Sequence, residues 1–576
     1  MINTPPACAG QARFVAPLAP PTQAPVPTHQ GPALQPAQAA NAPFTGRLAV
    51  GLCGVLLAVL LAGFNEHVTE GGLADLSGAL SLGHDDATWL TALFEAFNIA
   101  AMAFAPWFAV TFSIRWLALA MLALAAASAL WLPFCPNLPT LWLTRCIQGL
   151  ACGSLPPLLM TVALRYLPPN IKIYGLGAYA LTSTFGPNLG LPLVGYLFEG
   201  AGWHWLSWDI VPLCAAAMGA IAWGLPQDPL KLERFRQFDW LGLITGLPAI
   251  CFLVIGLFEG DRLDWFRNPA ITHLILAGLV LFAAFLINEW HHPVPFFRIQ
   301  LLKSRNVSDA LLTLTGVLVL DVATLQVPET FLEAVHHLRP IQIAPLALGL
   351  ALPQLGTLVL VAAFCNLRWV DCRHVLLAGL GLQGLSYFLA SWIDFDWMGG
   401  DFGPMMALQA LSQPMIVIPI LMLATLSLQP TDGPFISGMF NMTKGFAAAV
   451  ATALLGALLR RREQYHSTML LDHHGAVRFQ LNGLADGAPG LILSRQLQPH
   501  LQARQATALF HGTVHTQATI LACADILTIM VGLCGALFAL NLILPQRVYP
   551  PGSAQPKPPP AQSFPAQPLP AQRRGT

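Results

Sequence analysis

Residues 47–70 read RLAVGLCGVLLAVLLAGFNEHVTE, an apolar run that opens on one basic residue and closes on a polar end. An α-helix needs about 20 predominantly apolar residues to cross ~30 Å of hydrocarbon. The run meets that length, and its last six residues bring ionisable side chains to one end of the helix. This stretch predicts a membrane-spanning helix.

Similar apolar runs repeat along the whole chain of 576 residues, with short polar stretches between them. Only 10% of the residues are charged and 55% are hydrophobic, whereas roughly a quarter of the residues of a soluble globular protein are charged. The composition excludes a water-soluble fold and predicts an all-α polytopic membrane protein. Its fourteen predicted spans are residues 47–70, 88–110, 116–134, 140–163, 173–198, 208–225, 239–258, 270–289, 306–328, 341–364, 374–392, 403–428, 435–459 and 518–544.

Lys and Arg are unevenly divided between alternate loops, and this bias predicts the orientation of a membrane protein. Fourteen spans place both tails on one side. If that side is the cytoplasm, the inner loops hold eleven basic residues and the short outer loops hold three. We therefore expect a multi-pass membrane protein with both termini in the cytoplasm. The inner set is Arg115, Arg165, Lys172, Lys231, Arg234, Arg236, Arg298, Lys303, Arg305, Arg368 and Arg373, and the outer set is Arg262, Arg267 and Arg339.

The predicted spans divide into two halves. The inner turns Ile114-Arg115-Trp116 and Leu367-Arg368-Trp369 occupy equivalent positions if the seventh and eighth spans are an insertion. Parallel six-helix repeats of this kind are the architecture of major facilitator transporters. We expect a six-helix bundle in 47–226, two inserted helices in 227–305 and a second bundle in 306–545.

Three polar segments lie outside the predicted spans. Residues 1–46 and 546–576 are rich in Pro, Gln and Ala, and both are predicted to be disordered cytoplasmic tails. The long loop 460–517 would lie in the periplasm. Its Leu and Gln spacing is compatible with an outward-projecting amphipathic hairpin, and a passive spacer is the alternative.

Five short motifs fall in order on the predicted spans. They are LTRCIQG at 143–149, GPNLG at 186–190, WHW at 203–205, FDWLG at 238–242 and EGDRLDWF at 259–266. In their order and placement they resemble the fourteen-span drug:proton antiporters of the EmrB type, within the major facilitator superfamily. The similarity extends from about residue 47 to residue 545.

The resemblance implies proton-coupled antiport that exports hydrophobic or amphipathic small molecules across the inner membrane, in multidrug efflux. It also implies a periplasmic adaptor (membrane-fusion) protein and an outer-membrane channel as partners, beside protons and membrane lipids. The proton gradient would drive transport without a cofactor, since the chain has no ATP-binding Walker motif. The family's acidic and basic latch after the second span is missing from FAVTFSIRW at 108–116, so gating is expected to differ.

The fifth predicted span contains candidate gating residues. Pro187 removes a backbone donor and bends the helix after Gly186, while Gly190 lets a neighbouring helix approach closely. The alternative is a kink without a gating role.

Charged residues within membrane spans are costly and are candidates for function. Glu66 and Glu70 are four residues apart and share a helix face, and Glu95 lies in the outer half of the second span. Arg145 enters the fourth span at a similar depth. We expect a proton relay of Glu66, Glu95 and Arg145, with Glu70 nearby. A solvated helix end at Glu66 and Glu70, or a permanent ion pair of Arg145, are the alternatives.

Four further residues are candidates for substrate binding. Asn98 shares a helix face with Glu95, and Gln148 follows Arg145 by one turn. Asp321 and Lys444 are in-membrane charges of the second half that could pair across a cavity.

Other functions fit the sequence less well. The net charge of zero gives no sign of a nucleic-acid partner, and the three His-His pairs lack the acidic neighbours of a metal site. Uptake by proton symport and a transport-inactive scaffold stay open. Asp85-Asp86 would suit a membrane glycosyltransferase, but the chain lacks a large outer domain. The pair also fits the first turn of a helix, so no enzyme is predicted.

Overall fold

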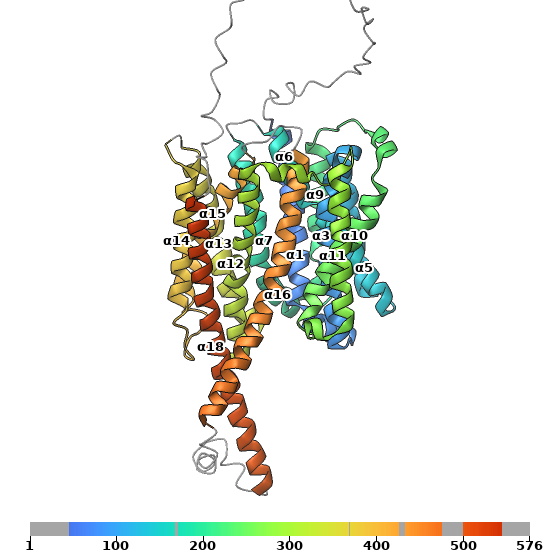
Figure 1. Cartoon of the computed structure of the whole chain (residues 1–576). Coiled ribbons are helices and arrows are strands. Elements are labelled where there is room, and N and C mark those ends of the chain that lie inside the picture. Colours follow the sequence, from blue (N-terminus) through green and yellow to red (C-terminus); the bar gives the residue numbers. More distant parts are fainter. Residues whose placement is uncertain (1–44, 168–170, 368, 426–432, 475–498, 544–576) are drawn as a thin grey trace, which may run out of the picture.

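The computed structural model describes residues 45–167, 171–367, 369–425, 433–474 and 499–543. The predicted C-terminal tail, the N-terminal tail apart from Thr45 and Gly46, and the centre of the 460–517 loop lie outside the described residues. Within those residues the regular structure is entirely helical, which confirms the predicted all-α class (Figure 1).

Each predicted span coincides with a helix or with a pair of consecutive helices. Twelve spans are long and apolar enough to cross a membrane by length and composition, and α7 and α14 lie at the two remaining predicted positions. The first half contains α1 (Gly46–Gly71), α2 (Leu73–Leu80), α3 (His84–Phe112), α4 (Ile114–Trp131), α5 (Leu138–Gly153), α6 (Pro156–Tyr166), α7 (Lys172–Ala201), α8 (Trp205–Trp208) and α9 (Ile210–Gly224). The remainder contains α10 (Trp240–Gly260), α11 (Pro269–His291), α12 (Arg305–His336), α13 (Pro340–Cys365), α14 (Cys372–Ala390), α15 (Gly403–Thr425), α16 (Gly433–His474) and α18 (Pro499–Ile543).

Helix ends follow local sequence signals. The Asn137 side chain accepts a hydrogen bond from the backbone N–H of Thr140 and caps α5. The fourth span breaks into α5 and α6 just before Pro156, which begins the second helix at a position where a missing N–H costs little. Asp85 and Asp86 lie in the first turn of α3, as predicted, where carboxylates favour the helix dipole.

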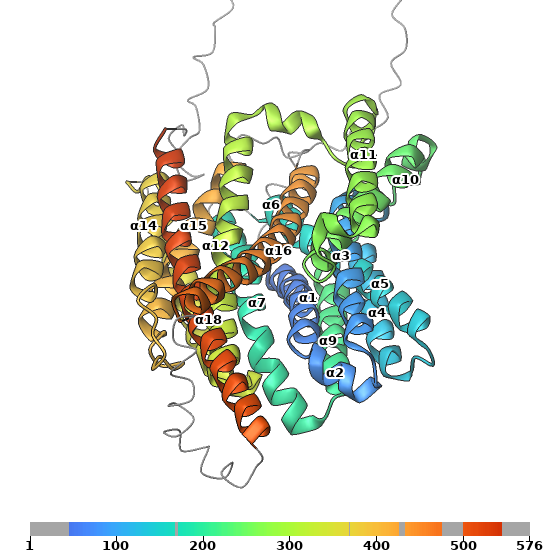
Figure 2. The same cartoon turned by 60° about the horizontal axis from the view of Figure 1, so that its bottom comes forward.

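The helices form two groups around a central region. In Figure 2, α1, α3, α4, α5 and α9 lie on one side, and α12, α14, α15 and α18 lie on the other. The groups meet where α7 packs on α13 and where α16 packs on α3 and α6. The inserted helices α10 and α11 pack on each other, and α10 also contacts α3 and α16. The inserted pair is therefore joined to the two groups through α10.

The described chain begins and ends on one face of the helical body, which we call the terminal face; Gly46 and Ile543 lie there (Figure 1). From the opposite face, the hairpin face, the ends of α16 and α18 project well beyond the other helices (Figure 1). With 42 residues, α16 is about 63 Å long, roughly twice the hydrocarbon thickness. The helical arms occupy much of the segment that was predicted as a loop from residue 460.

Polar contacts join the two projecting arms near the body. The His466 Nε2 atom lies 2.8 Å from the Asp525 carboxylate, and His515 Nδ1 lies 2.9 Å from Glu463 Oε1. Arg462 adds a contact of 3.5 Å to Asp525. The described part of the 460–517 segment thus forms two helical arms in contact, as the hairpin alternative expected.

Candidate functional site

A cavity of about 1030 Å³ lies between the two helix groups. Its deepest polar residues, such as Asn98, Gln413 and Asn441, are at most 3% exposed, whereas His84, Glu333 and Arg339 at its other end are exposed. These exposed residues belong to helix ends on the hairpin face. The cavity therefore opens on the hairpin face and ends near the middle of the bundle.

The opposite half of the interface is closed by direct contacts between the groups. The Ser437 hydroxyl donates to the Pro157 carbonyl at 2.6 Å, and the Tyr179 hydroxyl donates to Asn441 Oδ1 at 2.7 Å. A Cβ atom on Gly438 would lie 2.6 Å from Pro106 Cγ, so α16 and α3 approach tightly here. Any opening toward the terminal face must separate these contacts.

Glu66 on α1 and Glu95 on α3 meet at Asn98. The Asn98 amide donates to Glu66 Oε2 at 3.2 Å and to Glu95 Oε2 at 3.3 Å. All three residues line the cavity, and the Glu66 side chain is 27% exposed. Glu66 thus faces the cavity, and the Glu70 side chain lies outside the described residues. The structure brings together two of the predicted relay acids through a neutral amide.

Arg145 lies behind this pair and does not line the cavity. It is 1% exposed, and its guanidinium donates to the Leu90 carbonyl at 3.2 Å and to Gln148 Oε1 at 2.7 Å. It also stacks over the Phe94 ring, 4.3 Å from the centroid. Its charge interacts electrostatically with Glu95. Gln148 is fully buried and orients Arg145, so in this conformation it does not reach the cavity as a substrate ligand would.

Two glycines of α5 explain this close packing. A Cβ atom on Gly149 would lie 2.3 Å from the Phe94 carbonyl oxygen, and one on Gly153 would lie 2.0 Å from the Asn98 carbonyl oxygen. Small residues four apart let helix backbones touch in a membrane. The motif at residues 143–149 therefore fixes α5 against the α3 turns that carry Glu95 and Asn98.

The candidate gating residues lie on α7, which continues as a helix through Pro187. Pro187 lines the cavity, and a Cβ atom on Gly190 would lie 2.3 Å from His67 Cβ on α1. This close approach is what the sequence predicted for Gly190. A Cβ atom on Gly186 would meet nothing within 4 Å. Next to them, Asn188 donates to Gln354 on α13 at 3.1 Å and so joins the two groups.

Asp321 on α12 and Lys444 on α16 line the same cavity. Asp321 accepts a hydrogen bond of 3.2 Å from the Gln383 amide. The Lys444 amine interacts electrostatically with both Glu66 and Asp321, yet it forms no ion pair of 4 Å or less with a described residue. The predicted pairing is therefore an interaction through space rather than a contact.

Buried amides of the second half escaped the sequence analysis. Gln354 donates to Gln413 at 2.5 Å, and Gln409 donates to the Ser386 hydroxyl at 2.7 Å. Gln383 links this network to Asp321. Uncharged amides inside apolar runs are the signal that could have identified these residues, because a buried amide needs a partner.

Two helix groups around a cavity that is open to one face and closed to the other define a membrane transporter. The chain belongs to the major facilitator superfamily, because the sequence model of the Major Facilitator Superfamily matches residues 55–452. The predicted family and fold class are thereby confirmed.

Named relatives are similar at low identity. The probable multidrug resistance protein EmrY of Escherichia coli K12 is 26% identical over 448 residues, which cover 74% of this chain and 84% of the relative. The multidrug export protein EmrB of Haemophilus influenzae is 23% identical over 462 residues, covering 77% and 88%. The fatty acid resistance protein FarB of Neisseria gonorrhoeae is 23% identical over 458 residues, covering 75% and 86%. This chain is thus a transporter with multidrug exporters among its relatives.

Among solved structures, the human organic anion transporter MFSD10 (TETRAN) has a TM-score of 0.51 at 12% identity. The match covers 86% of this chain and 100% of the human protein. At that identity it shows the fold alone, in agreement with the helix arrangement described above.

Proposed function

We propose that this transporter is a proton-coupled antiporter that exports hydrophobic or amphipathic small molecules across the bacterial inner membrane. The observation that carries the proposal is the bridge of Glu66, Asn98 and Glu95 at the wall of a cavity shared by both helix groups. Two carboxylates that share one amide lie close enough to interact, so this bridge is a place where a proton can bind and later leave. A proton taken there can leave when the cavity changes its exposure.

Lys444 extends this proposal to the second half. Because its charge interacts with both Glu66 and Asp321, protonation of either acid changes the balance of charge across the cavity. A substrate entering between the groups would meet the same charges. In the proposal the hairpin face is periplasmic, and the described conformation is outward-open.

Apolar side chains complete the cavity and suit an amphipathic substrate. Val59, Met102, Leu318, Val322 and Phe258 lie on its wall among the acids and amides. Binding sites for small molecules are mostly apolar with a few polar groups that orient the ligand. The related multidrug exporters support this substrate class.

We further propose that a periplasmic adaptor protein, leading to an outer-membrane channel, docks on the projecting arms of α16 and α18. The arms extend from the face on which the cavity opens (Figure 1). A partner bound there would receive substrate as it leaves the cavity.

Substrate flux in inside-out vesicles tests the coupling. The vesicles have an acidic interior and receive a panel of cationic dyes and hydrophobic weak acids from outside. Each compound is measured with and without an uncoupler. We expect Glu66→Gln and Glu95→Gln each to reduce gradient-driven accumulation at least tenfold. The matched control is Glu333→Gln at the exposed rim, which should retain most of the flux.

Three outcomes would overturn the proposal. Full gradient-driven accumulation by both Gln variants would exclude these acids as proton carriers. Movement of substrate together with the proton would make the protein a symporter. No flux of any panel member would favour a transport-inactive scaffold.

A further inference from the structure

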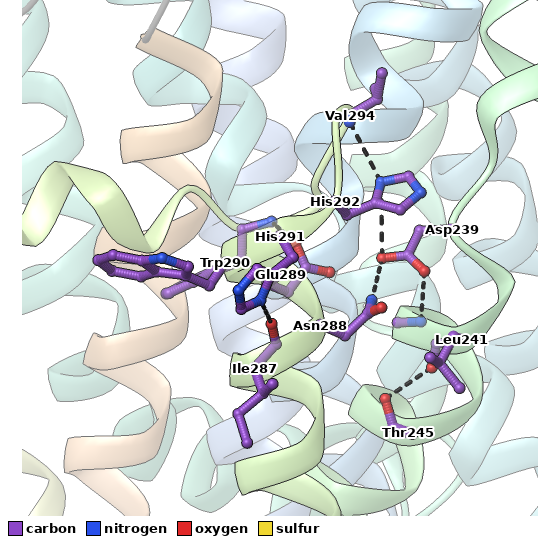
Figure 3. Close-up of polar contacts among 12 residues, drawn as sticks. Asp239, Leu241, Thr245, Ile287, Asn288, Glu289, Trp290, His291, His292 and Val294 are labelled. Atoms are coloured by element: carbon purple, nitrogen blue, oxygen red, sulfur yellow. Dashed lines mark hydrogen bonds and ion pairs between the residues drawn. The ribbon is translucent and has the colours of Figure 1, made fainter.

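A second pair of acids lies outside the cavity, where the inserted helices meet at the terminal face. Asp239 caps the start of α10, and Glu289 lies in the last turn of α11 (Figure 3). They are 2% and 0% exposed, and neither lines the cavity. The charge of a buried acid pair must be balanced by donors, by cations or by a bound proton.

Neutral donors bind three of the four carboxylate oxygens. Asp239 Oδ1 accepts from the Gly242 backbone N–H at 2.7 Å, and Asp239 Oδ2 accepts from the Asn288 amide at 2.5 Å (Figure 3). Glu289 Oε2 accepts from the Phe297 backbone N–H at 2.9 Å. Glu289 Oε1 is buried and receives no hydrogen bond from a described donor.

The oxygen without a donor faces the other acid. A Cβ atom built on Gly242 would lie 2.8 Å from Glu289 Oε1 and 2.4 Å from Asp239 Oδ2. Both oxygens therefore lie next to the position that a side chain at residue 242 would occupy. The two carboxyl groups are thus neighbours, and they interact electrostatically. Glycine at position 242 leaves the space in which they meet.

No lysine or arginine of the described residues lies within 4 Å of either carboxylate. The nearby bases are engaged with aromatic rings: Arg234 over Trp107 at 5.3 Å, Lys303 over Trp290 at 5.0 Å, and Arg298 over Phe435 at 4.6 Å. Each of these three distances runs to the ring centroid. Two negative charges side by side in a buried site, without a cation, are strongly disfavoured.

Histidines are the other titratable groups at this junction. His292 Nδ1 lies 3.9 Å from Asp239 Oδ2, and its side chain is 21% exposed. That nitrogen already accepts from the Val294 backbone N–H at 3.2 Å, which fits a neutral ring. The neighbouring His291 turns away and contacts the Ile287 carbonyl (Figure 3). Toward α3 the junction meets aromatic rings, including Trp107 and Phe104.

We propose that Asp239 and Glu289 together bind one proton, at a site separate from the transport cavity and exchanged with water at the terminal face beside His292. The proton on Glu289 Oε1 turns that atom into a donor to Asp239 Oδ2. It therefore satisfies the one unpartnered oxygen and leaves a single negative charge, which the Gly242, Asn288 and Phe297 donors stabilise.

The bound proton holds three segments together. Asp239 begins α10, Glu289 ends α11, and the Phe297 backbone belongs to the connection that leads toward α12. Aromatic contacts tie this junction to α3, with ring centroids of Phe238 and Trp107 4.9 Å apart and those of Phe296 and Phe104 5.0 Å apart. Loss of the proton would leave two carboxylates that repel each other at the junction where the inserted helices pack on α3.

Infrared difference spectroscopy tests the site directly, since the carbonyl stretch of a protonated carboxyl is distinct from the bands of a carboxylate. Full-length protein in lipid vesicles at neutral pH is compared with Glu289→Gln, whose amide replaces the protonated acid. We expect the loss of one protonated-carboxyl band, and this band should shift when the vesicles are transferred to D₂O.

Glu259 gives a matched control on α10. It is 1% exposed, but its carboxylate forms an ion pair with Arg262 at 2.5 Å. Glu259→Gln should remove carboxylate intensity and leave the protonated-carboxyl band in place. If Glu289→Gln also removes only carboxylate intensity, the proposal is wrong, and equal loss of the protonated band in both variants would overturn the assignment as well.

A second variant covers the case in which Glu289→Gln does not fold. Asp239→Asn replaces the charged acceptor of the shared proton by a neutral amide, so we expect the protonated-carboxyl band to shift or disappear. An unchanged band in this variant would contradict the proposal. The readout is independent of transport, so it stands or fails apart from the proposed antiport.

Discussion

A few hydrogen bonds and one buried charge determine how the acids of the first half are arranged. Glu95 is held by the Asn98 amide on one side, and the charge of Arg145 acts on it from behind. The guanidinium stays in place because Gln148 and the Leu90 carbonyl accept two of its hydrogens. Arg145 thus acts on Glu95 from a buried position outside the cavity.

The glycines of α5 and α7 give a prediction at this scale. Gly149→Ala places a Cβ atom 2.3 Å from the Phe94 carbonyl oxygen, which can only be relieved by moving α5 away from α3. We expect a loss of about 2 kcal/mol or more in the free energy of unfolding. Gly186→Ala is the control, since its Cβ would meet nothing within 4 Å, and its stability should stay within about 0.5 kcal/mol.

Thermal unfolding of the purified variants in detergent measures the difference. Equal unfolding temperatures for the two variants would show that α5 does not rest on the α3 backbone as described. A matching loss of transport in Gly149→Ala alone would link the packing to the position of Glu95.

At the scale of helices, run length predicted the elements well, because the bilayer sets one required length for every apolar helix. The face that each helix turns inward was harder to predict. Arg145 and Gln148 are buried away from the cavity although both are polar, since the α5 glycines determine which side of that helix packs on α3. For the segment beyond residue 460, the Leu and Gln spacing was compatible with an amphipathic hairpin, but it could not decide between a hairpin and a spacer.

The projecting hairpin carries the prediction for this scale. Deletion of residues 470–510 removes the ends of both arms and keeps the contacts of His466 and His515 at their base. We expect drug resistance of cells to fall to the level of a strain without the transporter, while vesicle transport and membrane insertion persist. This separation follows because the cavity residues lie on other parts of the chain.

Resistance that survives the deletion would exclude a docking role for the arms. A variant that neither inserts nor transports would instead show that the arms are needed to fold the body. A control deletion confined to the N-terminal residues 1–40 should leave resistance intact.

At the scale of the whole molecule, the sequence predicted the charged residues of the cavity better than their contacts. Glu66, Glu95, Asp321 and Lys444 were found because charge inside a membrane is costly and therefore conspicuous. That they surround one space depends on how two helix groups pack, which local patterns do not encode. The amides that complete the second half were missed for a related reason. Their burial depends on partners far away in sequence: the partner of Gln354 on α13, for example, is Asn188 on α7.

Access from one side only is the prediction for the whole molecule. In a variant without native cysteines, Ser183→Cys lies in the cavity wall, whereas Ser437→Cys lies buried in the closed half. A membrane-impermeant maleimide added from the hairpin side should label position 183 at least tenfold faster than position 437. Equal labelling would contradict the described conformation, and protection of position 183 by a substrate would place that substrate in the cavity.

The continuity of α16 has a mechanical consequence. One helix runs from Gly433 to His474, and Lys444 lies in its cavity-facing part. From Lys444 to the described tip the helix extends for about 45 Å at 1.5 Å per residue. A tilt of about 10° beside the cavity would therefore displace the tip by about 8 Å, because the rigid helix amplifies the motion as a lever does. A protein resting on the arms could thus sense the charge state of the cavity without touching it.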